Sequence, residues 1–140
     1  MYCIAVIFLF ACSSNEKKQE ATTEEAPVVK VASYSAAFDA SFENVLNGYY
    51  ALRDALVAGD TAAANKATGL LVQSADELKL DELKAVDTSN IIIPTAKTYT
   101  GSISSEGKGL LGESNIEEKR KAFQMISGNL FDLTRTVRYS

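Results

Sequence analysis

The chain has 140 residues, which is the length of one ordinary domain. Its composition, 46% apolar and 23% charged, is that of a globular protein and argues against disorder along the whole chain. The net charge of -4 argues against a surface that binds nucleic acid, and the absence of histidine excludes Ser-His, Cys-His and His-metal mechanisms.

The start of the chain has the character of a secretory signal. Met1–Ala11 carry no charge, and Cys3–Ala11 is nearly all large and apolar. As a helix this run measures about 16 Å, roughly half of a bilayer core, so it is too short to span a membrane. Its length matches the apolar region of a signal peptide, and the polar chain begins directly after it. We therefore interpret residues 1–11 as a signal peptide.

The sequence Leu9-Phe10-Ala11-Cys12 resembles the lipobox of bacterial lipoprotein signals. The resemblance implies cleavage after Ala11 and lipidation of Cys12, which would anchor the protein in the cell envelope. Ser13 after the cysteine implies the outer membrane facing the periplasm, with surface exposure as the other location. Two features depart from the family: Phe10 is bulky, and no Lys or Arg precedes the apolar run, as expected if the start codon lies further upstream. The competing interpretation is an N-terminal strand or buried helix with a chance cysteine.

Residues 12–34 differ in composition from the rest of the chain. After Cys12 they contain four Glu and three Lys, and no large apolar side chain precedes Val28. Such a segment buries too little apolar surface to offset the entropy of ordering, so we predict a disordered, flexible tether with an r.m.s. length of about 25 Å. An acidic, lysine-containing run after a lipidated cysteine also fits a surface-export signal.

The folded domain is predicted over residues 35–140, and its periodicity is helical. The first helix carries large side chains at spacings of 4, 3, 4, 3 and 4: Phe38, Phe42, Val45, Tyr49, Leu52 and Leu56. Gly59 is expected to end this helix and Asp60 to cap the next. The second helix is predicted to run to about Val86. Its expected inner face is formed by Ala63, Ala67, Leu70, Leu71, Ser74 and Leu78.

Two more helices complete the prediction. The third, from about Pro94 to Leu111, is expected to be the least stable because it contains several glycines. The fourth should begin with a capping box in which Asn115 is the cap and Glu118 reaches back. It then carries a regular apolar stripe of Ile116, Phe123, Ile126, Leu130, Leu133 and Val137. Four helices with short connections predict an all-α fold, an antiparallel up-down four-helix bundle.

Two segments, Tyr49–Asp60 and Ile116–Ser127, resemble an uncharacterised helical domain of Gram-negative lipoproteins. The same domain occurs at the C-terminus of periplasmic adaptors of heavy-metal efflux pumps, and the resemblance covers residues 38–138. It implies an accessory role in metal efflux or handling. Relatives continue into a tail with a Cys-Pro-Met element, whereas this sequence stops at Ser140, so we expect a truncated frame or a fragment. With no His, no free Cys after processing and only Met125 after the signal, we expect no metal bound by this chain alone.

Other candidate sites are weak. The near-repeat Asp76–Lys84 would place the Glu77 and Asp81 carboxylates on one helix face, which suggests a cation site. The simpler interpretation is a solvated surface on which Asp76 pairs with Lys79 and Asp81 with Lys84. Met125 is expected to pack in the core. The fourth helix is the only net-basic element, and we interpret its charges either as a docking surface or as local packing on acidic neighbours. Its basic residues are Lys119, Arg120, Lys121, Arg135 and Arg138. Of the adjacent Tyr49 and Tyr50, one should be partly exposed.

The sequence thus favours a non-enzymatic, lipid-anchored binding or scaffold module. We expect no catalytic residue and no cofactor. The expected partners are membrane lipid, reached through acylated Cys12, and a protein of the cell envelope. The alternative is a small-ligand binder, or an enzyme that uses carboxylate, Lys and Tyr side chains in the bundle core. A buried polar constellation between helices would favour the alternative, and an apolar core with an exposed patch would favour the binding module.

Overall fold

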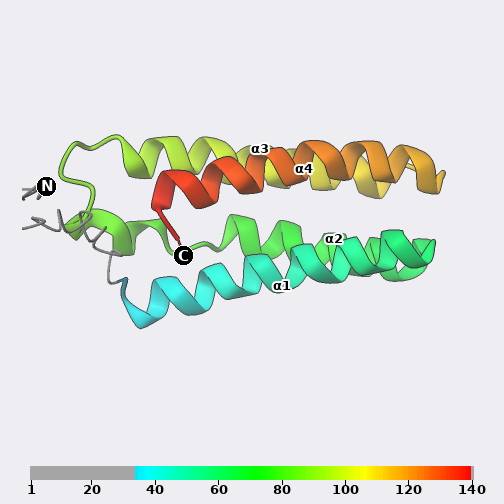
Figure 1. Ribbon diagram of the computed structural model, residues 1–140, viewed down its shortest axis with the longest axis horizontal. Helices are drawn as coiled ribbons and strands as arrows, with labels where there is room; N and C mark the ends of the chain where they lie inside the picture. The colour runs from blue at the N-terminus through cyan, green and yellow to red at the C-terminus, as the bar shows by residue number, and fades with distance from the viewer. Residues whose placement is uncertain (1–33, 140) are drawn as a thin grey trace, which may run out of the picture.

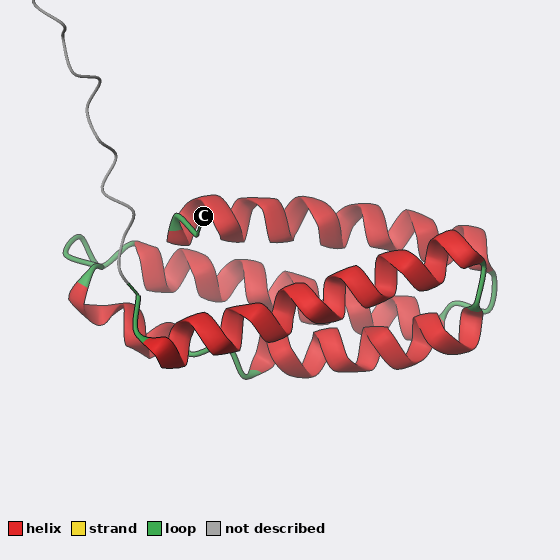
Figure 2. Ribbon diagram, turned by 60° about the horizontal axis from the view of Figure 1, so that its bottom comes forward, coloured by secondary structure: helices red, strands yellow, loops and turns green. Residues whose placement is uncertain are grey.

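The computed structural model describes residues 34–139, and within that range it is all-helical (Figures 1 and 2). The long helices are α1 (Ala36–Ala58), α2 (Thr61–Asp76), α3 (Ile92–Gly112) and α4 (Ile116–Val137), and a short 3-10 helix, η1 (Leu80–Ala85), precedes α3. The predicted signal peptide, Cys12 and the tether up to residue 33 lie outside the described residues.

The boundaries between α1 and α2 confirm the local signals in the sequence. The Ser35 hydroxyl accepts the Phe38 N–H at 3.1 Å and begins α1, a cap that the sequence had not indicated. Gly59 ends this helix with φ of 72°, a left-handed conformation that only glycine adopts without a steric penalty. One residue later, the Asp60 carboxylate accepts the Ala63 N–H at 2.9 Å and begins α2.

The predicted extent of α2 is wrong, because the helix ends at Asp76 rather than near Val86. Leu78 and Leu80 are two residues apart, so a continuous α-helix would point them in nearly opposite directions. Breaking the helix allows both of them and Leu83 to be buried. On the α2 surface itself Leu70 is 50% exposed and not part of the inner face, because its neighbour Leu71 takes the core position.

The first N–H groups of α3 are bound by the carboxylate of Asp87, which lies four residues before the N-cap Ile91 and which the sequence had not indicated. Its Oδ1 accepts the N–H groups of Ile91 and Ile92 at 2.9 and 3.0 Å, and its Oδ2 accepts that of Ile93 at 2.9 Å. Pro94 follows in the first turn, where a missing N–H costs little. Burial by itself raises the pKa of the Asp87 carboxyl, but the backbone N–H donors outweigh burial and lower this pKa below its ordinary value.

The helix α4 begins at the predicted residue without the predicted capping box. The Asn115 Oδ1 accepts the N–H of Glu117 at 2.7 Å. Glu118 does not reach back to Asn115. It instead pairs with the Lys121 ammonium, one turn further along the helix, at 2.7 Å. The helix start is therefore set by one side-chain cap and by the two acidic residues of the first turn, which favour the positive end of the helix dipole.

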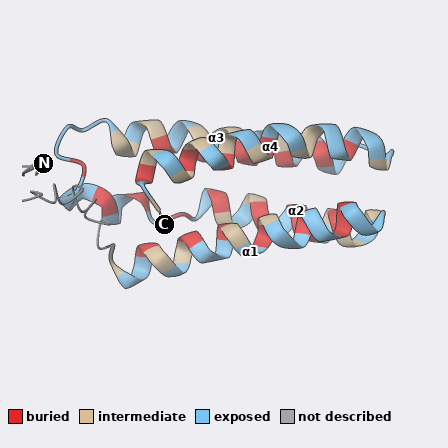
Figure 3. Ribbon diagram, viewed as in Figure 1, coloured by how far each residue is buried: buried red, intermediate tan, exposed pale blue. Residues whose placement is uncertain are grey.

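The core runs along the inside of the helical bundle (Figure 3). The predicted α1 stripe is confirmed at every position, with Tyr49 only partly buried. The α4 stripe is buried from Ile126 onward, and Phe123 packs against its edge. Gly48 allows α1 and α2 to approach closely, since a Cβ atom there would lie 2.9 Å from the Leu71 Cα atom.

The helices do not pack equally on all sides. Each of α1, α2 and α3 packs extensively on the helix that follows it in the chain, whereas α1 and α4 touch each other at few points. Figures 1 and 2 show α1 and α4 on the same side of the molecule, with the C-terminal end of the described chain returning toward α1. The α1–α4 side is thus the least tightly closed. No helix of the described part is long and apolar enough to cross a membrane.

Candidate functional site

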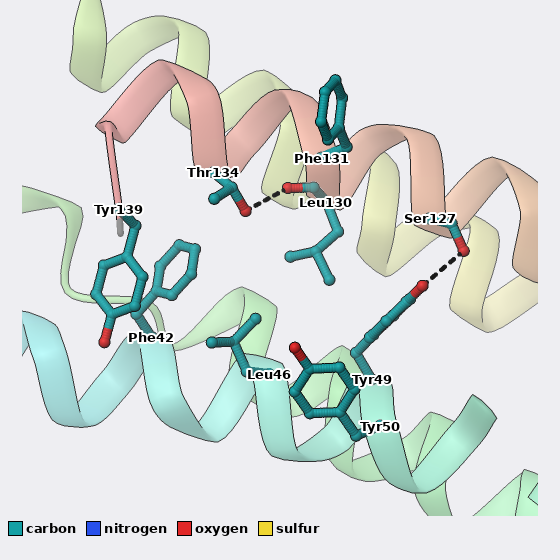
Figure 4. Close-up of a pocket in the computed structure, with 9 residues that line it drawn as sticks. All are labelled: Phe42, Leu46, Tyr49, Tyr50, Ser127, Leu130, Phe131, Thr134 and Tyr139. Carbon is teal, nitrogen blue, oxygen red and sulfur yellow. Dashed lines mark hydrogen bonds between the residues drawn. The ribbon is translucent and has the colours of Figure 1, made fainter. Parts of the chain in front are cut away.

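A pocket of about 280 Å³ opens between α1 and α4 (Figure 4). We call it the α1–α4 pocket. Most of its walls are aromatic or aliphatic side chains, and its hydroxyl groups belong to three tyrosines, one serine and one threonine. The lining residues are Phe42, Leu46, Tyr49, Tyr50, Ser127, Leu130, Phe131, Thr134 and Tyr139.

One end of the α1–α4 pocket is closed by Tyr139. Arg138 ends α4 in a left-handed conformation with φ of 55°, and this turn sends the chain back toward α1. The Tyr139 ring then stacks on Phe42 with 4.2 Å between ring centroids. The Tyr34 hydroxyl donates to the Val137 carbonyl, which ties the start of the described chain to the same corner. Burial raises the pKa of Tyr139, and the nearby Asp39 and Glu43 carboxylates raise it further.

The other end is closed by contacts between the middle of α1 and α4. The Tyr49 ring stacks on Phe123 at 5.0 Å, and its hydroxyl lies 3.1 Å from the Ser127 Oγ (Figure 4). Because Ser127 donates its own proton to the Phe123 carbonyl, Tyr49 is the donor in this pair. Further along, the Arg120 guanidinium donates to the Leu56 carbonyl at 2.8 and 3.2 Å. The pocket is therefore bounded along the helix axes.

The rim of the α1–α4 pocket exposes two aromatic side chains. Tyr50 on α1 is 45% exposed and Phe131 on α4 is 62% exposed. The exposure of Tyr50 confirms the expectation that one tyrosine of the Tyr49-Tyr50 pair faces solvent. Each ring carries a guanidinium near its face: Arg53 lies 5.0 Å from the Tyr50 centroid and Arg135 lies 5.5 Å from that of Phe131.

The chemistry of this pocket is that of an apolar binding site. Its floor includes Leu130, which is 5% exposed. The Thr134 hydroxyl donates to the Leu130 carbonyl at 2.8 Å, so this hydroxyl, like that of Ser127, gives its proton to the backbone of its own helix. A ligand in the pocket therefore gains mainly from the burial of apolar surface.

Lys119, which the sequence analysis grouped with the basic surface of the fourth helix, is fully buried. Its ammonium donates to the Asn65 Oδ1 at 2.8 Å and to the Leu110 carbonyl at 2.7 Å, near the C-terminal end of α3. A cation at that end is favoured by the helix dipole. The signal was present in the register: Lys119 lies three residues after Ile116 and four before Phe123, a core position of the apolar stripe.

The acidic near-repeat does not form one helix face. Glu77 lies at the end of α2 and Asp81 lies in η1. The predicted ion pair between Lys84 and Asp81 is present at 3.5 Å, whereas Asp76 pairs with Lys108 at 3.6 Å rather than with Lys79. Within residues 34–139, no three carboxylate, thiol or imidazole side chains gather in a way that could hold a metal ion.

Two further sequence interpretations concern single residues. The expectation that Met125 packs in the core is wrong, because its side chain is 57% exposed on the outer side of α4. Cys12, the predicted lipidation site, lies outside the residues that the structure describes.

Comparison with known proteins gives one match. Residues 45–140 match the sequence model of a family described as "Protein of unknown function (DUF3347)". The match includes α1 from Val45 onward and all of the other helices, and so it contains nearly the whole α1–α4 pocket. No curated protein and no solved structure matches the chain.

Proposed function

The chain belongs to this DUF3347 family of proteins of unknown function, since the match covers well over half of its length. From the pocket, we propose that the protein is a non-enzymatic binding module of the cell envelope. The binding site of the module is the α1–α4 pocket. The observation that carries the proposal is an apolar pocket whose rim exposes Tyr50 and Phe131 on the least closed side of the bundle.

The use of the polar side chains supports a binding role over an enzymatic one. An enzyme in the bundle core would need a titratable group aimed at a substrate. The buried Lys119 ammonium instead bonds to Asn65 and to a backbone carbonyl, and Tyr49 donates to Ser127. These groups are already engaged in holding helices together, which favours the binding module over the alternative of a carboxylate, Lys and Tyr enzyme.

As the scaffold for this pocket we propose the antiparallel up-down arrangement of the four long helices. The short turn at Gly59 and Asp60 and the short connection between α3 and α4 support it, because such connections return the chain alongside the preceding helix. In this arrangement the first and last helices become neighbours. Because α1 and α4 contact each other at few points, a ligand can bind between them without disturbing the packing of the other helix pairs.

We further propose that acylation of Cys12 anchors the module in the outer membrane facing the periplasm, where it is accessory to heavy-metal efflux or handling. The support is the lipobox-like Leu9-Phe10-Ala11-Cys12 and the resemblance to domains of efflux adaptors. Two or three acyl chains hold a protein stably on a membrane, whereas one gives marginal binding.

Site-specific photocrosslinking in cells tests the binding role. A benzophenone amino acid replaces Phe131 at the rim or, as a matched control, Met125, which is similarly exposed on another side of the same helix. We expect discrete adducts from position 131, with protein or with a small molecule, and none from position 125. Equal adduct formation at both positions, or none at position 131, would refute a binding site in the α1–α4 pocket.

A further inference from the structure

Resting on the proposed binding role, we propose that the ligand of the α1–α4 pocket is a single-chain carboxylate amphiphile, namely a medium-chain fatty acid. Its hydrocarbon tail lies between α1 and α4, and its carboxylate lies at the rim near Arg53 and Arg135.

The pocket has the size and polarity for a hydrocarbon tail. Its volume of about 280 Å³ is nearly twice that of an engineered apolar cavity of about 150 Å³ that accepts benzene. Phe42 and Tyr49 are seven positions apart in α1, which gives an apolar length of about 10 Å. The hydroxyls of Ser127 and Thr134 donate to backbone carbonyls and that of Tyr49 pairs with Ser127, so three of the five hydroxyl groups of the lining are already engaged within the protein.

The closed ends decide between a compact tail and a protein helix. Tyr139 stacked on Phe42 blocks one end, and the contact of Tyr49 with Phe123 and Ser127 blocks the other. A helix docked along a groove continues past its apolar anchors along the groove axis, and the two closed ends of this pocket prevent that. Entry is therefore from the rim, end-on, by a narrow apolar group.

The charges at the rim determine the headgroup. The Arg53 and Arg135 guanidinium groups lie over the rim rings Tyr50 and Phe131. Arg53 also pairs with Asp54 at 2.8 Å, whereas Arg135 has no ion pair with another side chain of residues 34–139. Of the other acidic groups of α1 near the pocket, Asp39 and Glu43 lie by Tyr139 at the closed end. A carboxylate is thus favoured at the rim beside Arg135, and a cationic headgroup is disfavoured there.

Calorimetric titration tests the proposal on the full chain carrying Cys12→Ala, so that no acyl group of its own is present. The probes are decanoate, decanol and decyltrimethylammonium, each below its micellar concentration. We expect saturable binding of one decanoate per chain and binding of the cationic amphiphile weaker by about tenfold or more. Equal affinity for the two charged probes, or no saturable decanoate binding, would overturn the proposal.

Three variants locate the ligand. Leu46→Trp fills the pocket and should abolish decanoate binding, and Arg135→Glu should weaken decanoate by about tenfold while leaving decanol unchanged. Met125→Glu, on another side of α4, is the control and should bind as the parent does. A circular dichroism melt verifies that each variant is folded. Decanoate binding that survives Leu46→Trp in folded protein contradicts the assignment. If crosslinking at position 131 captures a protein while decanoate does not bind, the inference fails and the proposed binding role stands.

Discussion

Replacing Lys119 by Ala should strongly destabilise the domain. The substitution removes three buried methylene groups, worth about 2.5 kcal/mol at about 0.8 kcal/mol each. It also removes the hydrogen bonds that the ammonium donates to the Asn65 Oδ1 at 2.8 Å and to the Leu110 carbonyl at 2.7 Å, at a cost of about 1–3 kcal/mol, although this carbonyl keeps the Glu113 N–H as a donor. Release of a buried charge offsets part of the loss. We expect a loss of about 3–5 kcal/mol in the free energy of unfolding.

The assay is urea unfolding followed by far-UV circular dichroism, with Lys119→Met and Lys121→Ala as companions. Lys119→Met keeps most of the packing and removes only the ammonium, so its cost should fall to about 1–3 kcal/mol. Lys121 forms an exposed pair with Glu118, and its truncation should change stability by less than about 0.5 kcal/mol. If Lys119→Ala costs no more than Lys121→Ala, the buried ammonium and its two bonds play no part in stability, and the reasoning is refuted.

Four further outcomes are expected. Leu52→Ala should cost about 2–5 kcal/mol of unfolding free energy in urea denaturation, whereas Lys66→Ala at an exposed position should cost almost nothing; equal costs would contradict the register of the core. Gly48→Ala should destabilise by about 1–3 kcal/mol because its Cβ meets the Leu71 backbone, while Gly69→Ala, which faces open space within α2, should stabilise by about 0.5–1 kcal/mol in the same assay. The pKa of Asp87 is lower in the folded chain than its ordinary 3.8, so its contribution to stability is present above that pH and is lost as pH falls through the folded value. Asp87→Asn should flatten this decline in the urea midpoints measured from about pH 5 to about pH 2. An unchanged slope would refute the role of Asp87 in the pH dependence. Finally, Cys12→Ala should move the protein out of the membrane fraction and abolish labelling by radioactive palmitate, and an unlabelled parent protein would rule out the lipid anchor.

The helix boundaries that the sequence predicted correctly depend on neighbouring residues. Asp60 and Asn115 bond to N–H groups two or three residues ahead, and Gly59 takes its left-handed conformation next to the helix that it ends. Such interactions are available to a short stretch of chain in isolation. The apolar stripes of α1 and α4 were likewise readable, because helical periodicity alone decides which side chains share a face.

The end of α2 required more than local information. The helix-forming near-repeat after Asp76 favours continuation, but a continuous helix would expose either Leu78 or Leu80. The core of the folded bundle accepts both, and burial of leucine side chains outweighs a few helical hydrogen bonds. Lys119 is a similar case, since its charge indicates the surface and only its place beside Asn65 and Leu110 provides the acceptors that make burial tolerable.

The α1–α4 pocket was decided entirely by the tertiary structure. Tyr49 and Ser127, which meet at one end of it, are 78 residues apart, and nothing in either segment specifies the other. The sequence determined that α1 and α4 each carry an apolar stripe, because a stripe is a property of one helix. Whether these two stripes pack against each other or leave a pocket depends on the distance at which α2 and α3 hold α1 and α4. The backbone positions fix the space that the side chains between them must fill.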